Sequence, residues 1–386
     1  MDFALTHEQL ILRDVVRKYC ADCCGFEARR GPGNSNAAKR SHWQRFADLG
    51  WLGLALPEEV GGTPGSACDH TIILEEFGRA IVVEPFLSCI SLAARVVDAG
   101  GRPDQRKKLL APVVRGELRI ALAHHQRDVG GSVTLARRGP MDTYVISGRK
   151  DIVLDGAEAD ILLVSAQLSD SLPGTDRLSV FIVDANSDGV ISRNYHTLDG
   201  MQACDVVLDE VRVNSDAVLG EVGQGSQAVR SGIEYSMIAA CAEMVGAMEG
   251  LLWLTRDYLR QRRQYGVALS SLQALQHRMA EMFAELELSR SMLYRGLSAL
   301  ENPDAEARHR LVRAVKAYVS SSGRFLGETA LQLHGAMGMA GEYKASHYFR
   351  RLVTLAALFG SPDEHRQRFA QADQLPPCPV LKGTPT

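Results

Sequence analysis

The sequence predicts a protein that is mainly α-helical with a small β domain in its middle, and three observations support this fold class. Apolar residues recur at helical spacing through roughly the first 117 residues. Short runs with the composition of strands, separated by turn residues, follow in residues 118–222. Four long helical patterns then fill much of residues 223–386, which predicts a four-helix bundle. We therefore expect three domains with these boundaries: residues 1–117, 118–222 and 223–386.

The first helix is expected to begin after Thr6. The Thr6 hydroxyl can accept a hydrogen bond from the backbone of Gln9, whose side chain can bond back to Thr6, which is a capping box. Residues 31–36 contain glycine, proline, serine and asparagine, so they are expected to form a loop. Another amphipathic helix is expected to start near Trp43, and a later one contains Glu75-Glu76-Phe77-Gly78-Arg79.

Four strands are expected in the β domain. Each is a short apolar run that ends at turn residues, and they span residues 144–148, 161–165, 179–183 and 203–208. Short strands separated by glycine, aspartate, asparagine and proline favour a small barrel or sandwich.

The four long helices are expected to span residues 233–264, 272–300, 305–333 and 343–358. Pro303 breaks the chain between the second and the third, because proline removes a backbone donor and clashes with the preceding turn. The tail, residues 376–386, is rich in proline and glycine and is expected to be loose.

The composition excludes several classes of protein. The hydrophobic fraction of 46% and the charged fraction of 23% are typical of a soluble globular protein. A net charge of −3 gives no reason to expect a nucleic-acid partner. A run of about 18 or more uncharged apolar residues, as a membrane span requires, does not occur. The first residues lack the basic and apolar regions of a secretion signal, so we expect a cytoplasmic protein.

The eight cysteines predict neither a disulfide framework nor a metal site. Cys20, Cys23 and Cys24 form the only cluster, and they lie in a helical pattern with no second Cys or His pair at zinc-like spacing nearby. In a cytoplasmic chain of this size we expect reduced thiols that serve as small apolar side chains.

Two segments, about seventy residues apart, contain the residue types that bind a pyrophosphate. Arg262-Arg263-Gln264-Tyr265-Gly266 lies at an arginine-rich helix end, where guanidinium groups can pair with two phosphates. Gln332-Leu333-His334-Gly335-Ala336-Met337-Gly338 is a glycine cluster that lets backbone amides approach a phosphate. Two plainer explanations stay open, namely a solvated basic face at the helix end and a glycine-rich turn without a ligand.

Both segments resemble the signature regions of the acyl-CoA dehydrogenase family, and weaker matches in the same order cover essentially the whole chain. They include Glu75-Glu76-Phe77-Gly78-Arg79, Gly148-Arg149-Lys150, Leu208-Asp209-Glu210-Val211-Arg212-Val213 and Val218-Leu219-Gly220-Glu221-Val222-Gly223-Gln224-Gly225. The resemblance implies the fold of that family, which has an N-terminal helical domain, a small β-barrel and a C-terminal four-helix bundle. It also implies α,β-dehydrogenation of an acyl-CoA thioester, FAD bound across a subunit interface of a tetramer, and electron-transfer flavoprotein as the electron acceptor.

The same resemblance implies which residues bind FAD. Arg262 matches the family position whose side chain reaches the pyrophosphate of a neighbouring subunit's FAD. Gln273 and Gln276 open the next helix, where the family has polar groups near the adenine, although a plain helix start explains them equally well. The expected cofactor-binding residues of these two segments and of the helix start between them are Arg262, Tyr265, Gln273, Gln332, Gly335, Ala336 and Gly338.

The residues expected to surround the flavin ring differ from those of the family. The family usually has a threonine after the first β-domain strand, where this chain has Leu122-Ala123-His124-His125-Gln126-Arg127. The tryptophan and the threonine or serine that stack on and bond to the flavin are replaced by Ile152 and Leu154, which core packing explains. His125 is the candidate donor to the flavin in place of the threonine, and a structural or exposed histidine is the alternative.

The residue at the expected position of the catalytic base also differs from the family pattern. Phe359 stands where many family members have the glutamate that removes the α-proton, and a phenyl ring cannot accept a proton. Some relatives place the base early in the first bundle helix, where this chain has Ser236. Glu243 lies two turns later on the same face, in an apolar run, and is therefore the candidate catalytic base. An ion pair with an arginine of a neighbouring helix stays open as its alternative, and Glu234 is expected to face elsewhere.

Within the family, the likeness is greatest to subunits of heteromeric members, the group of the small subunit of pimeloyl-CoA dehydrogenase. Cys241-Ala242-Glu243-Met244-Val245-Gly246 and His347-Tyr348-Phe349-Arg350-Arg351-Leu352 carry it. Such subunits pair with a larger acyl-CoA dehydrogenase subunit in a heterotetramer, where the partner can supply the base. Three hypotheses follow: a dehydrogenase in a homo- or heterotetramer, a non-catalytic subunit that completes its partner's FAD site, and a flavin oxidase or monooxygenase of the same fold.

Overall fold

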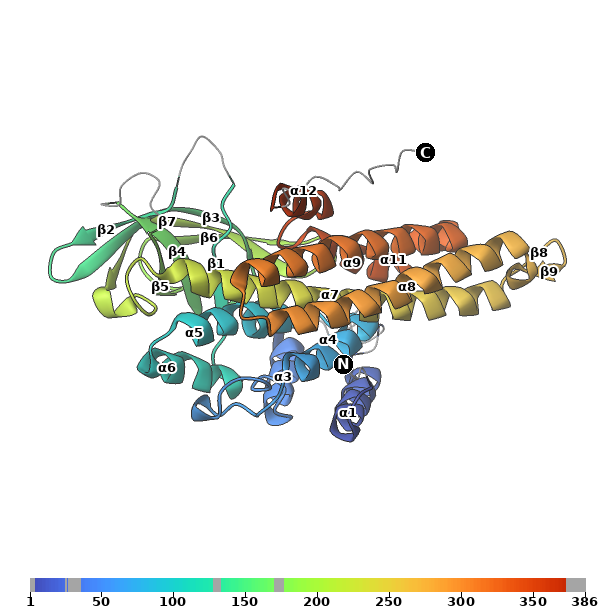
Figure 1. Cartoon of the computed structure of the whole chain (residues 1–386), viewed down its shortest axis with the longest axis horizontal. Coiled ribbons are helices and arrows are strands. Elements are labelled where there is room, and N and C mark those ends of the chain that lie inside the picture. The colour runs from blue at the N-terminus through green and yellow to red at the C-terminus, as the bar shows by residue number, and fades with distance from the viewer. Residues whose placement is uncertain (1–3, 25, 27–35, 128–132, 170–176, 373–386) are drawn as a thin grey trace, which may run out of the picture.

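The computed structural model describes residues 4–24, 26, 36–127, 133–169 and 177–372. A layer of short helices lies along one side of a long helical bundle, and a curled β-sheet lies at one end of the bundle (Figure 1). The predicted fold class, mainly α with a central β domain, is confirmed. The loop predicted at residues 31–36 and the tail at 376–386 lie outside the described residues, apart from Asn36, which begins a helix.

The N-terminal part of the chain is helical, as predicted. The capping box is confirmed, since the Gln9 backbone N–H donates to Thr6 Oγ1 at 3.2 Å and the Thr6 N–H donates to Gln9 Oε1 at 3.0 Å. A nine-residue π-helical segment, η3, is buried throughout. The helices are α1 (His7–Cys23), α3 (Asn36–Asp48), η2 (Glu58–Val60), α4 (Ala67–Ala80), η3 (Phe86–Ala94), α5 (Arg95–Gly100) and α6 (Pro103–Val114).

The β domain is one seven-stranded sheet, in the order β1-β4-β2-β3-β7-β6 with β5 on the other side of β4. The four predicted strands are present, but β3 continues through Gly148 instead of ending there, with irregular register on either side of this glycine. A second apolar core fills the curl of the sheet. The strands are β1 (Ile120–Ala123), β2 (Leu135–Gly139), β3 (Thr143–Leu154), β4 (Ile161–Leu168), β5 (Leu178–Asp184), β6 (Val190–His196) and β7 (Gln202–Asn214).

The predicted four long helices are confirmed, with shifted ends. The first begins eight residues before its predicted start, because Gly225 and the residues after it pack on the β domain. The helices of the bundle are α7 (Gly225–Gln261), α8 (Gln273–Leu300), α9 (Ala305–His334) and α11 (Lys344–Ala357), followed by α12 (Pro362–Ala372). Between them lie the hairpin strands β8 (Arg263–Gln264) and β9 (Val267–Ala268) and the short α10 (Ala336–Met339). The 3₁₀ turns are η4 (Gly156–Glu158), η5 (Ser215–Ala217) and η6 (Leu269–Ser271).

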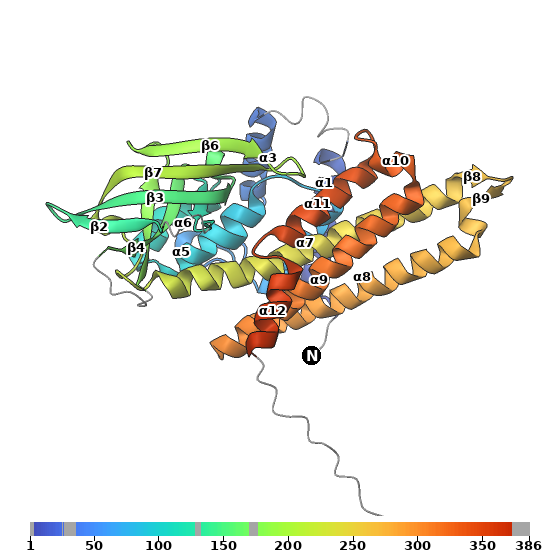
Figure 2. The same ribbon diagram turned by 90° about the horizontal axis from the view of Figure 1, so that it is seen from above.

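Helix α7 is the central helix of the molecule (Figure 2). Among the described helices it is the one that is long and apolar enough to cross a membrane, but 78% of its most apolar window is buried inside the protein. That burial is what a core helix requires, because an all-round apolar helix in a globular protein must be covered by its neighbours. Seven described cysteines are free, and no group of described His, Cys, Asp and Glu side chains could hold a metal ion.

Helices α4 and α7 cross at two glycines. A Cβ atom built on Gly78 would lie 1.9 Å from the backbone oxygen of Glu243, and one on Gly246 would lie 1.8 Å from that of Glu75. Only a residue without a side chain permits this approach.

We expect Gly78→Ala to destabilise the protein by about 1–3 kcal/mol, because the two helices would have to move apart. This reverses the usual gain from alanine in a helix. Gly327→Ala in α9 is the matched control, since a Cβ there meets flexible side-chain atoms of Phe349 and Leu352. Urea titrations followed by circular dichroism measure both, and equal losses in the two variants would contradict the close-crossing argument.

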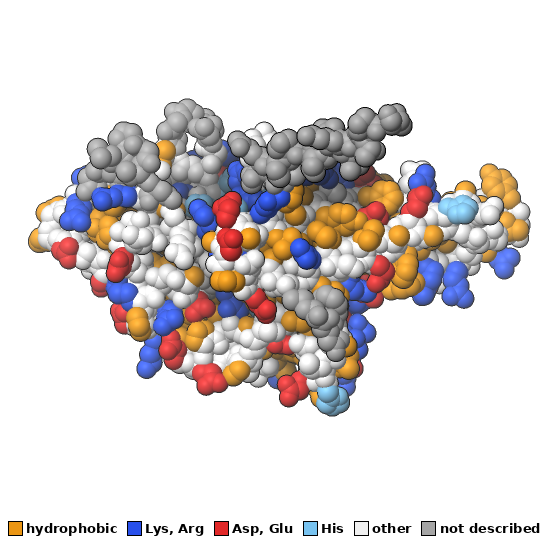
Figure 3. Space-filling view, viewed as in Figure 1, with side chains coloured by type: hydrophobic (Ala, Val, Ile, Leu, Met, Phe, Trp, Pro, Cys, Tyr) orange, Lys and Arg blue, Asp and Glu red, His pale blue; other side chains and the backbone are white. Residues whose placement is uncertain are grey.

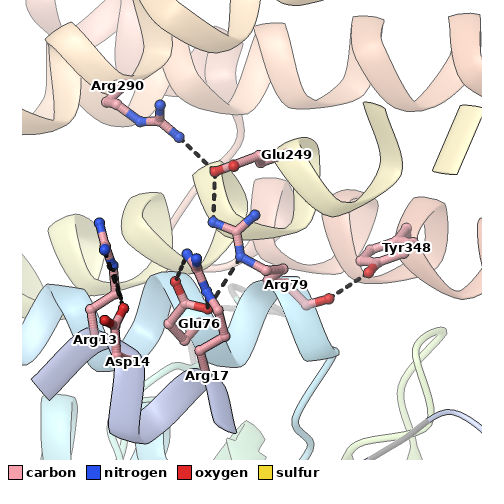
Figure 4. Close-up of polar contacts among 8 residues, drawn as sticks. All are labelled: Arg13, Asp14, Arg17, Glu76, Arg79, Glu249, Arg290 and Tyr348. Carbon is pink, nitrogen blue, oxygen red and sulfur yellow. Dashed lines mark hydrogen bonds and ion pairs between the residues drawn. The ribbon is translucent and has the colours of Figure 1, made fainter. Parts of the chain in front are cut away.

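A network of ion pairs joins the N-terminal helices to the bundle (Figure 4). The Glu249 carboxylate accepts hydrogen bonds from Arg79 and Arg290, each at 2.7 Å, and Arg79 continues to Glu76 at 3.2 Å. Arg17 of α1 reaches Glu76 at 2.8 Å. Burial opposes ionisation of Glu249, but the bond from Arg79 and the nearby positive charges outweigh it and lower its pKa to about 2.

This shift predicts a pH dependence of stability. The pKa of Glu249 lies below its ordinary value of 4.5, so its contribution is fully present above that pH and is lost as the pH falls towards 2. We expect Glu249→Gln to cost about 2 kcal/mol at pH 7 and almost nothing near pH 2. Burial raises the pKa of neighbouring Glu75 to about 7, and its contribution has the opposite sign, so it is lost as the pH rises through 7. Urea midpoints of both proteins between pH 2 and 6 measure the difference, and a difference that stays constant would contradict this account.

Candidate active site

A cavity of about 900 Å³ lies where the β domain meets the bundle. Its walls come from the end of β1, from β3, from the first turns of α7 and α9, and from the loop between α11 and α12. The cavity brings together three positions that the sequence singled out, Ile152, Leu154 and Phe359, and His125 lies at its edge. A large, partly apolar cavity with several titratable side chains is the usual form of a substrate site.

Phe359 lies in a strained loop on the cavity wall. Its backbone φ is +64°, in a region that non-glycine residues rarely adopt, and Gly360 follows with a φ of +111°. Lys316 of α9 fixes this loop from behind, because its buried Nζ donates to the carbonyl oxygens of Leu355 (2.8 Å) and Ala356 (3.2 Å) at the end of α11. The position expected for a base therefore lies on the cavity wall, in a loop anchored by Lys316, and is occupied by a side chain that cannot accept a proton.

The opposite wall is the β domain. Ile152, with a φ of +53°, and Leu154 are half-buried and line the cavity, so they form its wall and do not belong to the sheet core as expected. His125 is exposed, and no described residue bonds to its ring. His124 is more enclosed, and its Nδ1 lies 2.9 Å from the Ser165 hydroxyl. Burial and the charge of nearby Lys150 lower the pKa of His124 to about 4, so this ring is neutral at physiological pH.

Glu234 faces elsewhere than Ser236 and Glu243, as expected: it lines the cavity, which those two residues do not, because α7 turns it towards α9. Arg308 Nε donates to one carboxylate oxygen at 2.9 Å, and His309 Nδ1 lies 2.8 Å from the other. Arg313 Nε donates to His309 Nε2 at 2.6 Å, so a neutral His309 carries its proton on Nδ1 and donates it to Glu234. Burial opposes ionisation of Glu234, but these bonds outweigh it and lower its pKa, which makes this carboxylate a weak base.

Glu243 is not among the residues that line the cavity. Its buried carboxylate lies 2.5 Å from Arg351 Nη2, and Arg351 Nη1 lies 2.6 Å from Asp199 in the loop between β6 and β7. Burial raises the pKa of Glu243, and the charge of Arg351 opposes that rise. The structure therefore favours the alternative explanation, an ion pair with an arginine of a neighbouring helix, and the role of Glu243 as a base stays a prediction.

The residues expected to bind the cofactor phosphates lie at the other end of the molecule. Figures 1 and 2 both place the β8–β9 hairpin, which follows Arg262, at the end of the bundle remote from the β domain. The side chains of Arg262, Gln273 and Gln332 are exposed, and Tyr265 is 98% exposed. Gly335 and Ala336 are exposed too, whereas Gly338 is buried against Leu331 and His334.

An aromatic cluster holds the glycine turn in place, and no pattern in the sequence indicated it. The Tyr258 and His334 rings lie 4.6 Å apart, and Tyr343 packs on His334 at 5.2 Å. The Tyr258 hydroxyl donates to the His334 carbonyl oxygen at 3.2 Å. Gly335 adopts a φ of +62°, and a Cβ built there meets no atom within 4 Å. The backbone of this turn is therefore held by the aromatic cluster and is open to a ligand on its outer side.

Sequence reasoning also missed three arginines of the cavity, Arg230, Arg313 and Arg368. They lie on α7, α9 and α12, which are separated widely along the chain. Their spacing follows no motif, so no pattern in the sequence could have grouped them.

Comparison with known proteins identifies relatives along nearly the whole chain. Models of the acyl-CoA dehydrogenase N-terminal, middle and C-terminal domains match residues 6–117, 124–211 and 223–372. The caffeyl-CoA reductase–Etf complex subunit CarC of Acetobacterium woodii is 28% identical over 79% of this chain and 82% of its own length. The short-chain specific acyl-CoA dehydrogenase of Clostridium acetobutylicum is 25% identical over 91% of this chain and 93% of its own length.

Solved structures share the fold. Butyryl-CoA dehydrogenase of Megasphaera elsdenii superposes with a TM-score of 0.87 at 22% identity, over 96% of this chain and 99% of that one. A variant of the Tcur3481–Tcur3483 steroid ACAD gives a TM-score of 0.83 at 27% identity, over 94% of this chain and 97% of that one.

Proposed function

Because the chain belongs to the acyl-CoA dehydrogenase family, we propose that it serves in the FAD-dependent α,β-dehydrogenation of an acyl-CoA thioester as one subunit of a tetramer. We propose further that its partner is a second, different acyl-CoA dehydrogenase chain, and that the assembly works in the cytoplasm. FAD, when bound, accepts the hydride that leaves the β-carbon of the substrate. Binding of the cofactor and removal of the α-proton depend on which residues each chain supplies.

The observation that carries the proposal is the separation of the two expected FAD-binding regions. The residues expected to bind the phosphates lie at the outer tip of the bundle, while the residues expected beside the flavin ring lie in the cavity at the other end. One chain cannot bring both regions to the same FAD. A second chain that places its cavity against this tip would complete the site, which supports an assembly.

The residues at the tip fit the diphosphate half of FAD. Arg262 offers a planar guanidinium that is free to bond two phosphates, and the open backbone at Gly335 admits a close approach. The cavity fits the ring half poorly, because Ile152 and Leu154 carry no hydrogen-bonding group. We therefore assign the chain's contribution to the phosphate half, through Arg262, Tyr265, Gln273, Gln332, Gly335, Ala336 and Gly338.

Phe359 supports the same assignment. A phenyl ring cannot remove the α-proton, and the cavity carboxylate Glu234 is already bonded to Arg308 and His309. We propose that the partner subunit supplies the base, so that this chain positions the cofactor and leaves the proton transfer to its partner. A role for His125 as donor to a flavin in this chain's own cavity would belong to the alternative, a self-sufficient dehydrogenase.

The surface of the bundle supports the assembly. Figure 3 shows apolar side chains gathered along α8 and α9 on one face of the molecule. Phe283 and Leu288 of α8 are 47% and 51% exposed, and Phe325 of α9 is 37% exposed. Contiguous exposed apolar surface of this kind marks a protein–protein contact. CarC belongs by name to a complex with Etf, so we also propose electron-transfer flavoprotein as the electron acceptor.

The absorption spectrum of the purified chain tests the proposal. We expect the chain to be colourless alone and to retain FAD when it is co-expressed with a larger acyl-CoA dehydrogenase chain. Anaerobic addition of an acyl-CoA should then bleach the flavin of the assembly. A bleachable flavin in the chain alone would establish a self-sufficient enzyme, and rapid reoxidation of the flavin by oxygen would favour an oxidase or monooxygenase.

A further inference from the structure

One wall of the cavity carries three guanidinium groups without a carboxylate partner. Arg230 of α7, Arg313 of α9 and Arg368 of α12 all line the cavity, and none of them forms an ion pair with a described residue. Among the described residues, Arg313 hydrogen-bonds to His309 alone, through its Nε to His309 Nε2. Burial and the charge of nearby Arg368 lower the pKa of Arg313, so these like charges are close enough to repel one another.

The described carboxylates of the same wall lie near these arginines without forming an ion pair with them. The charges of Glu234 and Glu306 oppose the lowering of the pKa of Arg313, and the hydrogen bonds from Ser361 together with the charge of Arg368 lower the pKa of Glu364. Glu234 is bonded to Arg308 and His309, and Glu364 accepts a hydrogen bond from the Ser361 backbone N–H at 2.7 Å. Glu306 is exposed at the rim, and no ion pair joins it to a described arginine. Arg230 and Arg368 are exposed at the rim, so solvent screens part of the repulsion among the three arginines, and an anion bound between them would relieve the rest.

A second, independent observation points to a ligand at this wall. His365 of α12 is 1% exposed and lines the cavity, yet neither ring nitrogen has a hydrogen-bond partner among the described residues. Its Nε2 lies 3.2 Å from a Cβ built on Gly360, so the ring lies beside the Phe359 loop. Burial and nearby Lys316 lower its pKa to about 4, so the neutral ring can donate one hydrogen bond. Buried polar atoms are almost always bonded, and an unbonded ring at a cavity indicates a missing partner.

We propose that Arg230, Arg313, Arg368 and His365 form an oxyanion subsite that holds an anionic group of an acyl-CoA bound in this chain's own cavity, apart from the flavin that the tip of the bundle helps the partner to hold. This rests on the proposed function, since it takes the ligand to be an acyl-CoA. Two anionic groups of such a ligand have the required chemistry: the phosphates of the CoA nucleotide and a carboxylate on the acyl chain. Planar guanidinium groups pair with both.

Arg230→Gln and Arg368→Gln test the subsite with little risk to folding, because both side chains are exposed at the rim. Arg366→Gln is the matched control, since it removes the same charge from α12 but belongs to an arginine that pairs with Asp363 and does not line this cavity. Titration calorimetry on the purified chain, or on its assembly with a partner, would measure binding of four probes: CoA, dephospho-CoA, a monocarboxylyl-CoA and the dicarboxylyl-CoA of equal length.

We expect each rim variant to bind its anionic probe about tenfold more weakly than the wild type, and Arg366→Gln to bind normally. A loss seen with CoA and absent with dephospho-CoA assigns the subsite to a phosphate. A loss confined to the dicarboxylyl-CoA assigns it to the acyl chain. Variants that bind every probe as tightly as the control would overturn the subsite.

Binding of inorganic pyrophosphate tests the subsite independently of the proposed function. If neither the chain nor its assembly with a partner binds any CoA compound, the proposed function fails. Pyrophosphate binding that weakens in Arg230→Gln and Arg368→Gln would still establish the oxyanion subsite. Pyrophosphate binding that is absent, or equal in all variants, would then overturn it as well.

Discussion

Arg351→Met is expected to destabilise the protein by about 3–5 kcal/mol, which is the typical cost of removing one partner from a buried ion pair. Arg351 is 1% exposed and holds Glu243 of α7 and Asp199 of the β domain at 2.5 and 2.6 Å. Burial disfavours its charge, but the two carboxylates outweigh this and raise its pKa, so the guanidinium stays ionised. Methionine would leave two carboxylates buried without a cation, at the place where the β domain meets the bundle.

The measurement is the first unfolding transition in urea, followed by circular dichroism, because a protein of several domains does not unfold in one step. Arg350→Met is the matched control, since Arg350 is the preceding residue on α11 and is only half-buried. A loss below 1 kcal/mol in Arg351→Met, or equal losses in the two variants, would show that the network contributes little to stability.

A substitution in the same network distinguishes the two explanations of Glu243, as a catalytic base or as an ion-pair partner of Arg351. We expect Glu243→Gln to lower stability by about 1–3 kcal/mol, because Arg351 loses one of its two carboxylate partners. The rate of flavin bleaching by an acyl-CoA, measured on the folded assembly, should stay within a few-fold of the wild type. A loss of about 100-fold or more in that rate, with stability unchanged, would instead establish Glu243 as the base.

The second large effect is expected at the tip of the bundle. Arg262→Gln should weaken FAD binding by the assembly about 100-fold, because glutamine cannot replace two charge-assisted hydrogen bonds to phosphate. The fold should be unaffected, since the Arg262 side chain is exposed and its backbone N–H bond to the Tyr258 carbonyl oxygen is kept.

FAD retained after gel filtration and fluorescence titration of the stripped assembly both measure this affinity. Arg263→Gln is the matched control, because Arg263 is exposed in the adjoining hairpin strand and carries the same charge. If the two variants bind FAD equally well, the assignment of Arg262 to the pyrophosphate is wrong, and the plainer explanation of a solvated basic face would hold.

The sequence by itself determined the fold class and most helices of the bundle. Helical spacing of apolar residues located α8, α9 and α11 to within about one residue, because that spacing follows from the period of the helix itself. The capping box at Thr6 was readable for the same reason, since all of its bonds lie within four residues. Local patterns were less informative for strands, whose hydrogen bonds join distant segments of the chain. Strand β3 continues past Gly148 because its partner strand β7 extends beyond that point.

Only the tertiary structure decided what each charged residue does. The sequence placed Glu243 and Glu234 on one helix but could not show that the first meets Arg351, 108 residues away, while the second faces the cavity. Arg230, Arg313 and Arg368 come together only because α7, α9 and α12 pack around the same cavity. A carboxylate or a guanidinium takes its role from the charges and the solvent around it, and contacts between distant segments set both.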